Sequence, residues 1–189
     1  MDTKTVAKNT RWHRKIHRYF AIASFFFLMM ISITGLLLIW KKNSGGYLLA
    51  ESHKGSSTEL SQWLSFDTLH KIAIATLRDS ISPDLSPELH RIDARPNKGM
   101  VKFTFENHYW AIQLDCATGK VLHLERRRAD FIEHLHDGSF FDKWAGGFFK
   151  LGYGTFVGLS LLLLTITGFY LWINPKRIRK GKINKKSSS

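Results

Sequence analysis

Cysteine is nearly absent from this 189-residue sequence, since Cys116 stands alone. One thiol cannot form a disulfide within the chain, and no CxxC motif is present. We interpret Cys116 as a packed or incidental residue. The sequence also lacks a Ser/His/Asp or Cys/His constellation, a phosphate-cradling loop, and a flavin or nicotinamide motif. The usual signatures of a hydrolase or of a nucleotide cofactor site are therefore missing.

Charge is absent from two long apolar runs. Tyr19–Trp40 spans 22 residues and Leu151–Ile173 spans 23. A membrane span needs ~20 apolar residues, so both runs predict transmembrane helices. The first run is too long for a cleavable signal peptide, and no A-x-A-like site follows it. We favour two spans over the alternative, two buried helices of a soluble protein.

Basic residues are concentrated at the two ends of the chain. The first 18 residues carry six Lys or Arg and one Asp, and the tail after Pro175 carries seven Lys or Arg and no acid. Residues 41–150 are nearly neutral, with 15 basic and 14 acidic residues. The positive-inside rule places both ends in the cytoplasm and residues 41–150 on the far side. Attraction to anionic lipid explains such tails, and nucleic acid is not an expected partner because no folded basic domain carries the charge.

The middle segment predicts a small α+β module. Apolar or small residues at 69, 72, 73, 76 and 77 predict one face of a helix that Ser65 or Asp67 caps. Two-residue alternation in "MVKFTFE" and "YWAIQLD" predicts antiparallel strands joined at residues 106–108. Gly119 suits a turn before a further short strand. Four histidines are scattered over this module, and we expect surface or packing roles for them: His70, His90, His108 and His123.

Four short motifs resemble those of one membrane protein family. "LDCATGKVLHLE" resembles the Asp-x-x-Thr-Gly turn and Val-Leu strand that close a PepSY domain. "KIHRYF" resembles the Leu-His-Arg start of the first helix in PepSY-associated transmembrane proteins, with Ile16 in place of Leu. "HLHDGSFF" and "TITGFYLWINPK" resemble the Leu-His-x-Gly start and the Leu-Thr-Gly-x-x-Leu-Trp-x-x-Pro end of later helices. The resemblance covers residues 11–176, although larger relatives carry four or more spans.

This resemblance and the hydropathy together predict the fold class: two transmembrane α-helices that flank a small extracytoplasmic PepSY-like domain, built from a helix and an antiparallel sheet. The expected location is a bacterial inner membrane, with residues 41–150 in the periplasm. The expected divisions are a basic cytoplasmic tail (1–18), a first span (19–40), a linker (41–64), the PepSY-like domain (65–128), a histidine-bearing juxtamembrane segment (129–150), a second span (151–173) and a basic cytoplasmic tail (174–189).

The two apolar runs resemble each other. The first ends "ITGLLLIW" and the second ends "ITGFYLWI", and histidines precede each run. Because the helices run in opposite directions, Thr34-Gly35 is expected near the outer face and Thr167-Gly168 near the inner face. This pattern is typical of an inverted-topology repeat. The second run also contains Gly154 and Gly158, a GxxxG motif that suits either packing within the chain or a dimer.

Histidines beside the spans are candidate ligands of haem iron. His13 and His17 share one helix face, a spacing that also suits Zn²⁺ or Cu²⁺. Neutral imidazole is a good axial ligand for haem iron. His17 and His136 are the principal candidates because they match the family motifs, and His13 and His134 are secondary. A membrane ~30 Å thick separates His17 from His136, so they are not expected to share one iron. A second ligand would then come from another helix, most simply from a second copy of the chain.

Two functions of different classes remain open at this stage. The first is a b-type haem electron-transfer component, a candidate subunit of a membrane ferric reductase, because the resemblance includes haem-containing ferric-siderophore reductases. The second is a non-catalytic accessory protein whose PepSY domain binds, assembles or inhibits a periplasmic partner. The lipid bilayer, a homodimer or membrane partner subunit, and that periplasmic partner are the expected partners.

Overall fold

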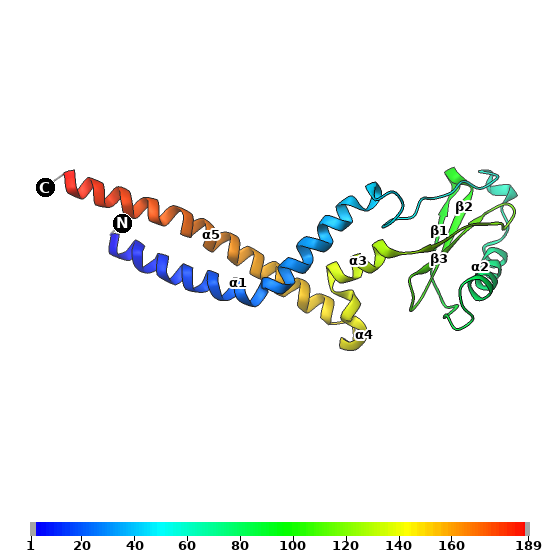
Figure 1. The fold of residues 1–189 in the computed structure, drawn as a ribbon, viewed down its shortest axis with the longest axis horizontal. Coiled ribbons are helices and arrows are strands. Elements are labelled where there is room, and N and C mark those ends of the chain that lie inside the picture. Colours follow the sequence, from blue (N-terminus) through cyan, green and yellow to red (C-terminus); the bar gives the residue numbers. More distant parts are fainter. Residues whose placement is uncertain (1–2, 188–189) are drawn as a thin grey trace. The chain divides into compact units, whose positions relative to one another are not determined.

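The computed structural model describes residues 3–187, which divide into two compact units. Among these residues, the helical unit consists of 3–35 and 134–187, and the sheet unit consists of 36–133. The division falls within helix α1 (Thr3–Trp40) and within helix α3 (Arg128–Asp137). Figure 1 labels the main elements. Short elements join them: η1 (Lys41–Asn43), η2 (Leu60–Gln62), η3 (Pro96–Lys98), η4 (Ser139–Phe141) and helix α4 (Asp142–Ala145).

Two long helices form the helical unit. Helix α1 and helix α5 (Phe149–Ser187) lie side by side and run antiparallel (Figure 1). The ring of Phe27 lies 5.7 Å from that of Tyr153 and 5.8 Å from that of Phe156. Both helices contain a stretch long and apolar enough to cross a membrane, and large apolar side chains such as Phe25 and Leu162 stay exposed along them. These surfaces contact the lipid bilayer, and the two predicted spans are confirmed.

The GxxxG motif of α5 does not pack against α1. A Cβ atom added at Gly154 or at Gly158 would meet no other atom within 4 Å. The motif therefore does not serve packing between the described helices of this chain, and its small-residue face remains exposed.

The sheet unit is a four-stranded antiparallel sheet with the order β1-β2-β3-β4. Helix α2 (Phe66–Ser80) packs on one face of it. The side-chain oxygen of Ser65 accepts the N–H of Thr68 at 3.1 Å, so Ser65 rather than Asp67, the other predicted candidate, caps the helix. The strands are β1 (Leu89–Arg95), β2 (Met100–Phe105), β3 (Trp110–Asp115) and β4 (Val121–Arg126).

One apolar core lies between α2 and the sheet. The predicted helix face is confirmed, since its residues at positions 69, 73 and 77 are fully buried. Phe103, Ile112 and Leu114 meet them from the central strands. Cys116 is also fully buried, and burial, followed by the charge of Asp115, raises the pKa of its thiol to about 11. Cys116 is thus a neutral packing residue, as expected.

The first strand was not predicted. β1 has the sequence "LHRIDAR", which mixes charged and apolar residues, and a register irregularity between Leu89 and Arg91 interrupts its alternation. It pairs with β2 from Leu89↔Phe105 to Arg95↔Met100. Its place in the sheet follows from this pairing rather than from a local apolar pattern.

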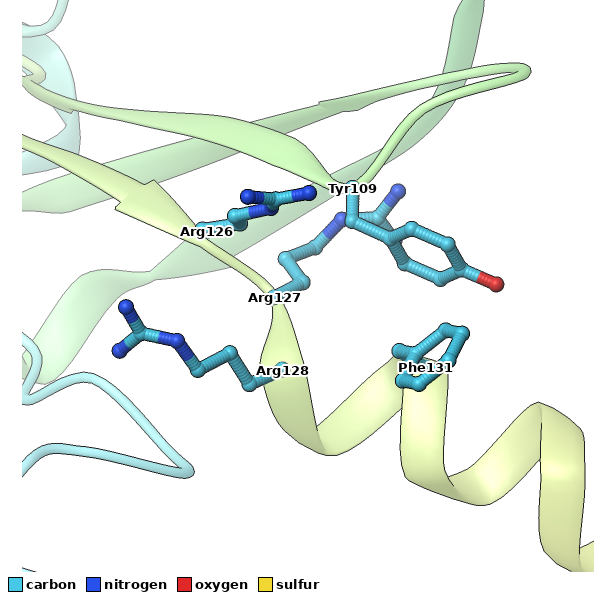
Figure 2. A pocket seen from close by; sticks show the side chains of 5 residues that line it. All are labelled: Tyr109, Arg126, Arg127, Arg128 and Phe131. Carbon is cyan, nitrogen blue, oxygen red and sulfur yellow. The ribbon is translucent and has the colours of Figure 1, made fainter.

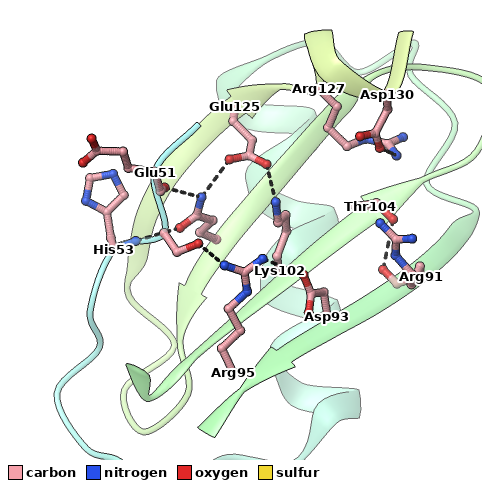
Figure 3. Close-up of polar contacts among 12 residues, drawn as sticks. Glu51, His53, Arg91, Asp93, Arg95, Lys102, Thr104, Glu125, Arg127 and Asp130 are labelled. Carbon is pink, nitrogen blue, oxygen red and sulfur yellow. Dashed lines mark hydrogen bonds and ion pairs between the residues drawn. The ribbon is translucent and has the colours of Figure 1, made fainter. Parts of the chain in front are cut away.

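The second face of the sheet carries a buried polar network (Figure 3). Lys102 Nζ lies 2.8 Å from Glu125 Oε1, and Gln113 Nε2 donates to Glu125 Oε2 at 2.7 Å. The Lys102 and Glu125 side chains are only 10% and 4% exposed. Charges so deeply buried require partners, and here each charge has one.

Part of the predicted linker covers this polar face. We call residues 51–57 the strap. Gln113 accepts the N–H of His53 at 3.1 Å and donates to the carbonyl of Glu51 at 3.0 Å. The strap also approaches the chain beyond β1, where Gly55 N–H donates to Lys98 O at 2.8 Å. A Cβ at Gly55 would lie 2.1 Å from the Gly99 oxygen, so only glycine permits this approach.

Candidate functional site

The first candidate site lies between the N-terminal half of α1 and the middle of α5. His17 Nδ1 lies 2.8 Å from the hydroxyl oxygen of Thr167. A Cβ added at Gly168 would lie 3.7 Å from His17 Cε1, so the imidazole lies directly against the glycine backbone. We call His17, Thr167 and Gly168 the His17 site.

The second candidate site repeats this arrangement at the other end of the helix pair. His136 Nδ1 lies 2.9 Å from the hydroxyl oxygen of Thr34. A Cβ added at Gly35 would lie 3.3 Å from His136 Cε1. We call His136, Thr34 and Gly35 the His136 site. Thr34 and His17 are separated by about 26 Å along α1 at about 1.5 Å per residue.

The threonine hydroxyls determine which imidazole nitrogen carries the proton. Thr167 Oγ1 donates to the carbonyl of Leu163 at 2.6 Å, and Thr34 Oγ1 donates to the carbonyl of Met30 at 2.7 Å. A hydroxyl has one proton, so a threonine that donates to its carbonyl can only accept from its histidine. A neutral imidazole that donates from Nδ1 satisfies this arrangement, and its Nε2 then carries the lone pair.

Neither Nε2 has a partner within the part of the chain that the structure describes, since the hydrogen bonds of both rings, His17 and His136, involve Nδ1 alone. Both side chains are half-buried. A metal-binding histidine commonly donates its other ring N–H to a fixed acceptor, which orients the ring and fixes its tautomer. The two threonines supply this second interaction, so each site offers one oriented imidazole ligand.

The loop around Gly138 positions His136. Gly138 has a positive φ of 80°, and a Cβ there would lie 2.6 Å from the Tyr153 ring. Asp137 accepts from the N–H of Ser139 at 2.9 Å and from Lys150 Nζ at 2.5 Å. Burial raises the pKa of Asp137, but the hydrogen bonds from Lys150 and Ser139 outweigh it and hold this pKa below its usual value. The carboxylate stays charged and ties the end of α3 to the start of α5.

The secondary candidates lie beside the principal ones without joining them in a common cluster. His13 stacks on Tyr170 with ring centroids 4.7 Å apart, and its Nδ1 is buried without a hydrogen-bond partner among the described residues. His134 lies on α3 two residues before His136 and is half-buried. The described residues contain no group of three or more His, Cys, Asp or Glu side chains that could hold a metal ion.

The histidines of the sheet unit have other surroundings. His70 stacks on Phe103 at 5.7 Å, and His90 Nδ1 lies 2.8 Å from Glu106 Oε1. His108 Nε2 lies 3.1 Å from the Ser86 carbonyl oxygen, and burial, followed by the charge of Arg127, lowers the pKa of its ring despite this contact. These packing and surface roles match the expectation.

A family model described as the PepSY-associated TM region matches residues 14–188. The chain belongs to this family. The match covers the sheet unit, most of both long helices and three of the four candidate histidines, since His13 lies just before it. No curated protein matches the chain, and no solved structure matches it.

Sequence reasoning missed the role of the threonines in this PepSY-associated protein. The sequence shows Thr34 and Thr167 as a similarity between the two spans, but it does not link them to the histidines. The signal that could have joined them was the expected topology, which placed His17 with Thr167-Gly168 at one face and His136 with Thr34-Gly35 at the other. The hydrogen bonds themselves depend on the rotation of each helix about its axis.

Proposed function

We propose that this PepSY-associated protein is a haem-binding electron-transfer component of a bacterial inner membrane, linked to the reduction of ferric iron or of a ferric siderophore. One observation carries the proposal: the two ends of the helix pair each hold an imidazole whose Nδ1 is fixed by a threonine and whose Nε2 is free for a metal.

The donor set suits haem b. A neutral imidazole is an axial ligand of haem iron, and the protonated Nδ1 fixes the tautomer that presents Nε2. The glycine beside each ring lets the imidazole lie directly against the backbone of the neighbouring helix, which helps to hold the ring in one orientation. Haem, when bound, supplies a one-electron couple between ferric and ferrous iron. His17 and His136 would hold one haem each, because about 26 Å of helix separates their sites.

A second axial ligand would come from another helix. We favour a second copy of the chain, because a two-fold axis along the membrane normal would supply an equivalent histidine at each site. The open Gly154 and Gly158 face of α5 supports this arrangement, since small residues allow helices to approach closely. A homodimer would thus offer four helices and complete both sites. A different membrane subunit is the other source of the ligand.

The charge distribution supports one orientation of the two sites in the membrane. With both basic tails in the cytoplasm, the His17 site lies toward the inner face and the His136 site toward the outer face. Electrons from a quinone or from a partner protein would enter at the inner face, and the acceptor would be ferric iron at the outer face. The sheet unit would then provide the periplasmic docking surface.

An absorbance spectrum of detergent-purified protein tests the proposal. We expect a Soret band and sharp α and β bands after reduction, at about one haem per site. His17→Ala and His136→Ala should each remove about half of the bound haem, and the double variant should remove nearly all of it. His13→Ala and His134→Ala are matched controls from the same segments and should keep most of the haem.

The accessory function is the competing outcome. A protein that is haem-free when purified from haem-replete cells, with unchanged thermal unfolding in both histidine variants, would overturn the electron-transfer proposal. The sheet unit would then be the functional part, and its edge strands β1 and β4 would be the places to seek a bound partner strand.

A further inference from the structure

A cavity of about 280 Å³ lies where β4 leads into α3 in the sheet unit. Three consecutive arginines and two aromatic rings line it (Figure 2): Arg126, Arg127, Arg128, Tyr109 and Phe131. We call this set the arginine–aromatic pocket. It is separate from both histidine sites, and its role does not depend on haem binding.

The middle arginine is a structural residue. Arg127 pairs with Asp130 at 2.8 Å and donates to the carbonyls of Phe105 and His108 at 3.2 and 2.9 Å. Its side chain is only 9% exposed, and its Nε is buried without an acceptor among the described residues. Donors therefore outnumber acceptors around this guanidinium, and the Arg127 charge is held permanently beside the cavity.

The outer arginines leave capacity for a ligand. Arg128 donates to the Tyr47 carbonyl at 3.1 Å and lies over the Tyr47 ring at 4.4 Å, which uses part of its guanidinium. The Arg126 side chain is exposed and has no ion-pair or hydrogen-bond partner among the described residues. A guanidinium fork matches the two oxygens of a carboxylate. Three arginines line the pocket and Asp130 pairs with one of them, so the pocket is positive and suits an anion.

The aromatic wall adds a preference for a flat ring. Tyr109 and Phe131 meet edge to face, with centroids 5.5 Å apart and planes at 86°. Burial raises the pKa of the Tyr109 hydroxyl, with Arg127 opposing this rise, so the phenol stays neutral. Phe131 is 38% exposed and presents apolar surface to the cavity. Rings of this kind stack with other aromatic groups.

We infer that the arginine–aromatic pocket binds a small organic anion that carries an aromatic ring, of the aromatic carboxylate class. Arg126 would hold the carboxylate, with the fixed charge of Arg127 and the remaining donors of Arg128 beside it. Phe131 and Tyr109 would contact the ring. The cavity is just below the ~300–1,000 Å³ of sites for drug-sized ligands, so one substituted ring is the appropriate size.

Titration calorimetry of the full-length protein in detergent, with salicylate as the probe, tests this inference. Cyclohexanecarboxylate has the same charge without an aromatic ring, and inorganic phosphate has charge alone. We expect saturable salicylate binding, with both comparison anions bound more weakly. Arg126→Gln should weaken salicylate binding about 10- to 100-fold, because it removes a bidentate, charge-assisted interaction. Phe131→Leu should weaken it several-fold and reduce the preference over cyclohexanecarboxylate.

Two controls keep the test decisive. Arg78→Gln removes another exposed arginine, on α2, and should leave the affinity unchanged. Arg126→Lys keeps the charge without the fork and should bind with intermediate affinity, and unchanged thermal unfolding would show that the variants fold. The inference is overturned if salicylate does not saturate, or if Arg126→Gln binds like the parent protein. Equal affinity for phosphate also overturns it, since the pocket would then recognise charge alone, as for a lipid headgroup.

Discussion

The two ends of the helix pair hold the same three groups by different means. At one end His17 belongs to α1, a continuous helix of 38 residues, and its threonine and glycine lie on α5. At the other end the threonine and glycine lie on α1, and His136 belongs to α3, a helix of 10 residues. The first histidine is oriented by a long helix, and the second by a short helix that the surrounding loop must position.

This difference shows what the shared sequence pattern requires. Each apolar run carries Ile-Thr-Gly near its end and each is preceded by a histidine-bearing segment, so antiparallel packing of the helices brings the histidine before one run to the threonine of the other. The His17 site needs only that packing. The His136 site also needs the Asp137–Lys150 contact and the turn at Gly138. We therefore expect the His136 site to be more sensitive to substitution than the His17 site.

The largest expected effect comes from removal of a threonine hydroxyl, and this change tests whether the two sites are equivalent. Thr167→Val and Thr34→Val remove the acceptor of each Nδ1–H and should lower haem affinity at the affected site about 10- to 100-fold. Each variant is measured as bound haem with the histidine of the other site replaced by Ala. In the haem-free protein, ¹⁵N NMR should show an Nδ1-protonated imidazole that becomes a tautomer mixture in the variant. An unchanged tautomer would contradict the proposed role of the threonine.

A smaller effect should separate the two ends. Gly35→Ala places a methyl group 3.3 Å from His136 Cε1, a close contact, whereas Gly168→Ala places one 3.7 Å from His17 Cε1, an ordinary contact. We expect the first change to lower haem content at its site several-fold and the second to change it less than about twofold, since the contact is only mildly close. Gly152→Ala also meets nothing within 4 Å, lies outside the Gly154–Gly158 motif and is the control. Equal losses of haem in the two variants would contradict the expected difference between the His136 site and the His17 site.

The smallest expected effect concerns Asp137 and acidic pH. Its pKa is lowered in the folded protein, so its contribution to stability is complete above the usual carboxyl pKa and is lost as the pH falls through the lowered value. Lys150 is 55% exposed, which limits this contribution to less than about 1 kcal/mol. Asp137→Asn should remove this acid dependence from thermal unfolding curves and lower the occupancy of the His136 site alone. A matching change at the His17 site would show that the two ends are coupled.

The elements with a strong local pattern could be predicted from the sequence. The helix that buries Leu69, Ala73 and Leu77 and the hairpin of β2 and β3 follow from periodicities of 3.6 and 2. The Ser65 cap follows from its own hydroxyl. β1 and the strap have no such pattern, because their hydrogen bonds go to residues distant in sequence, as from Gln113 to the backbone of Glu51 and His53.

The sequence alone determined that two apolar helices cross a membrane, that basic residues lie at the chain ends and that histidines precede both spans, since length, composition and spacing are local properties. Only the tertiary structure decided that His17 meets Thr167 and that Thr34 meets His136, across separations of 150 and 102 residues. Such contacts depend on how each helix is rotated and how far it has slid along its neighbour. An almost uniformly apolar helix carries little pattern to fix either quantity, and close packing of side chains in three dimensions fixes both.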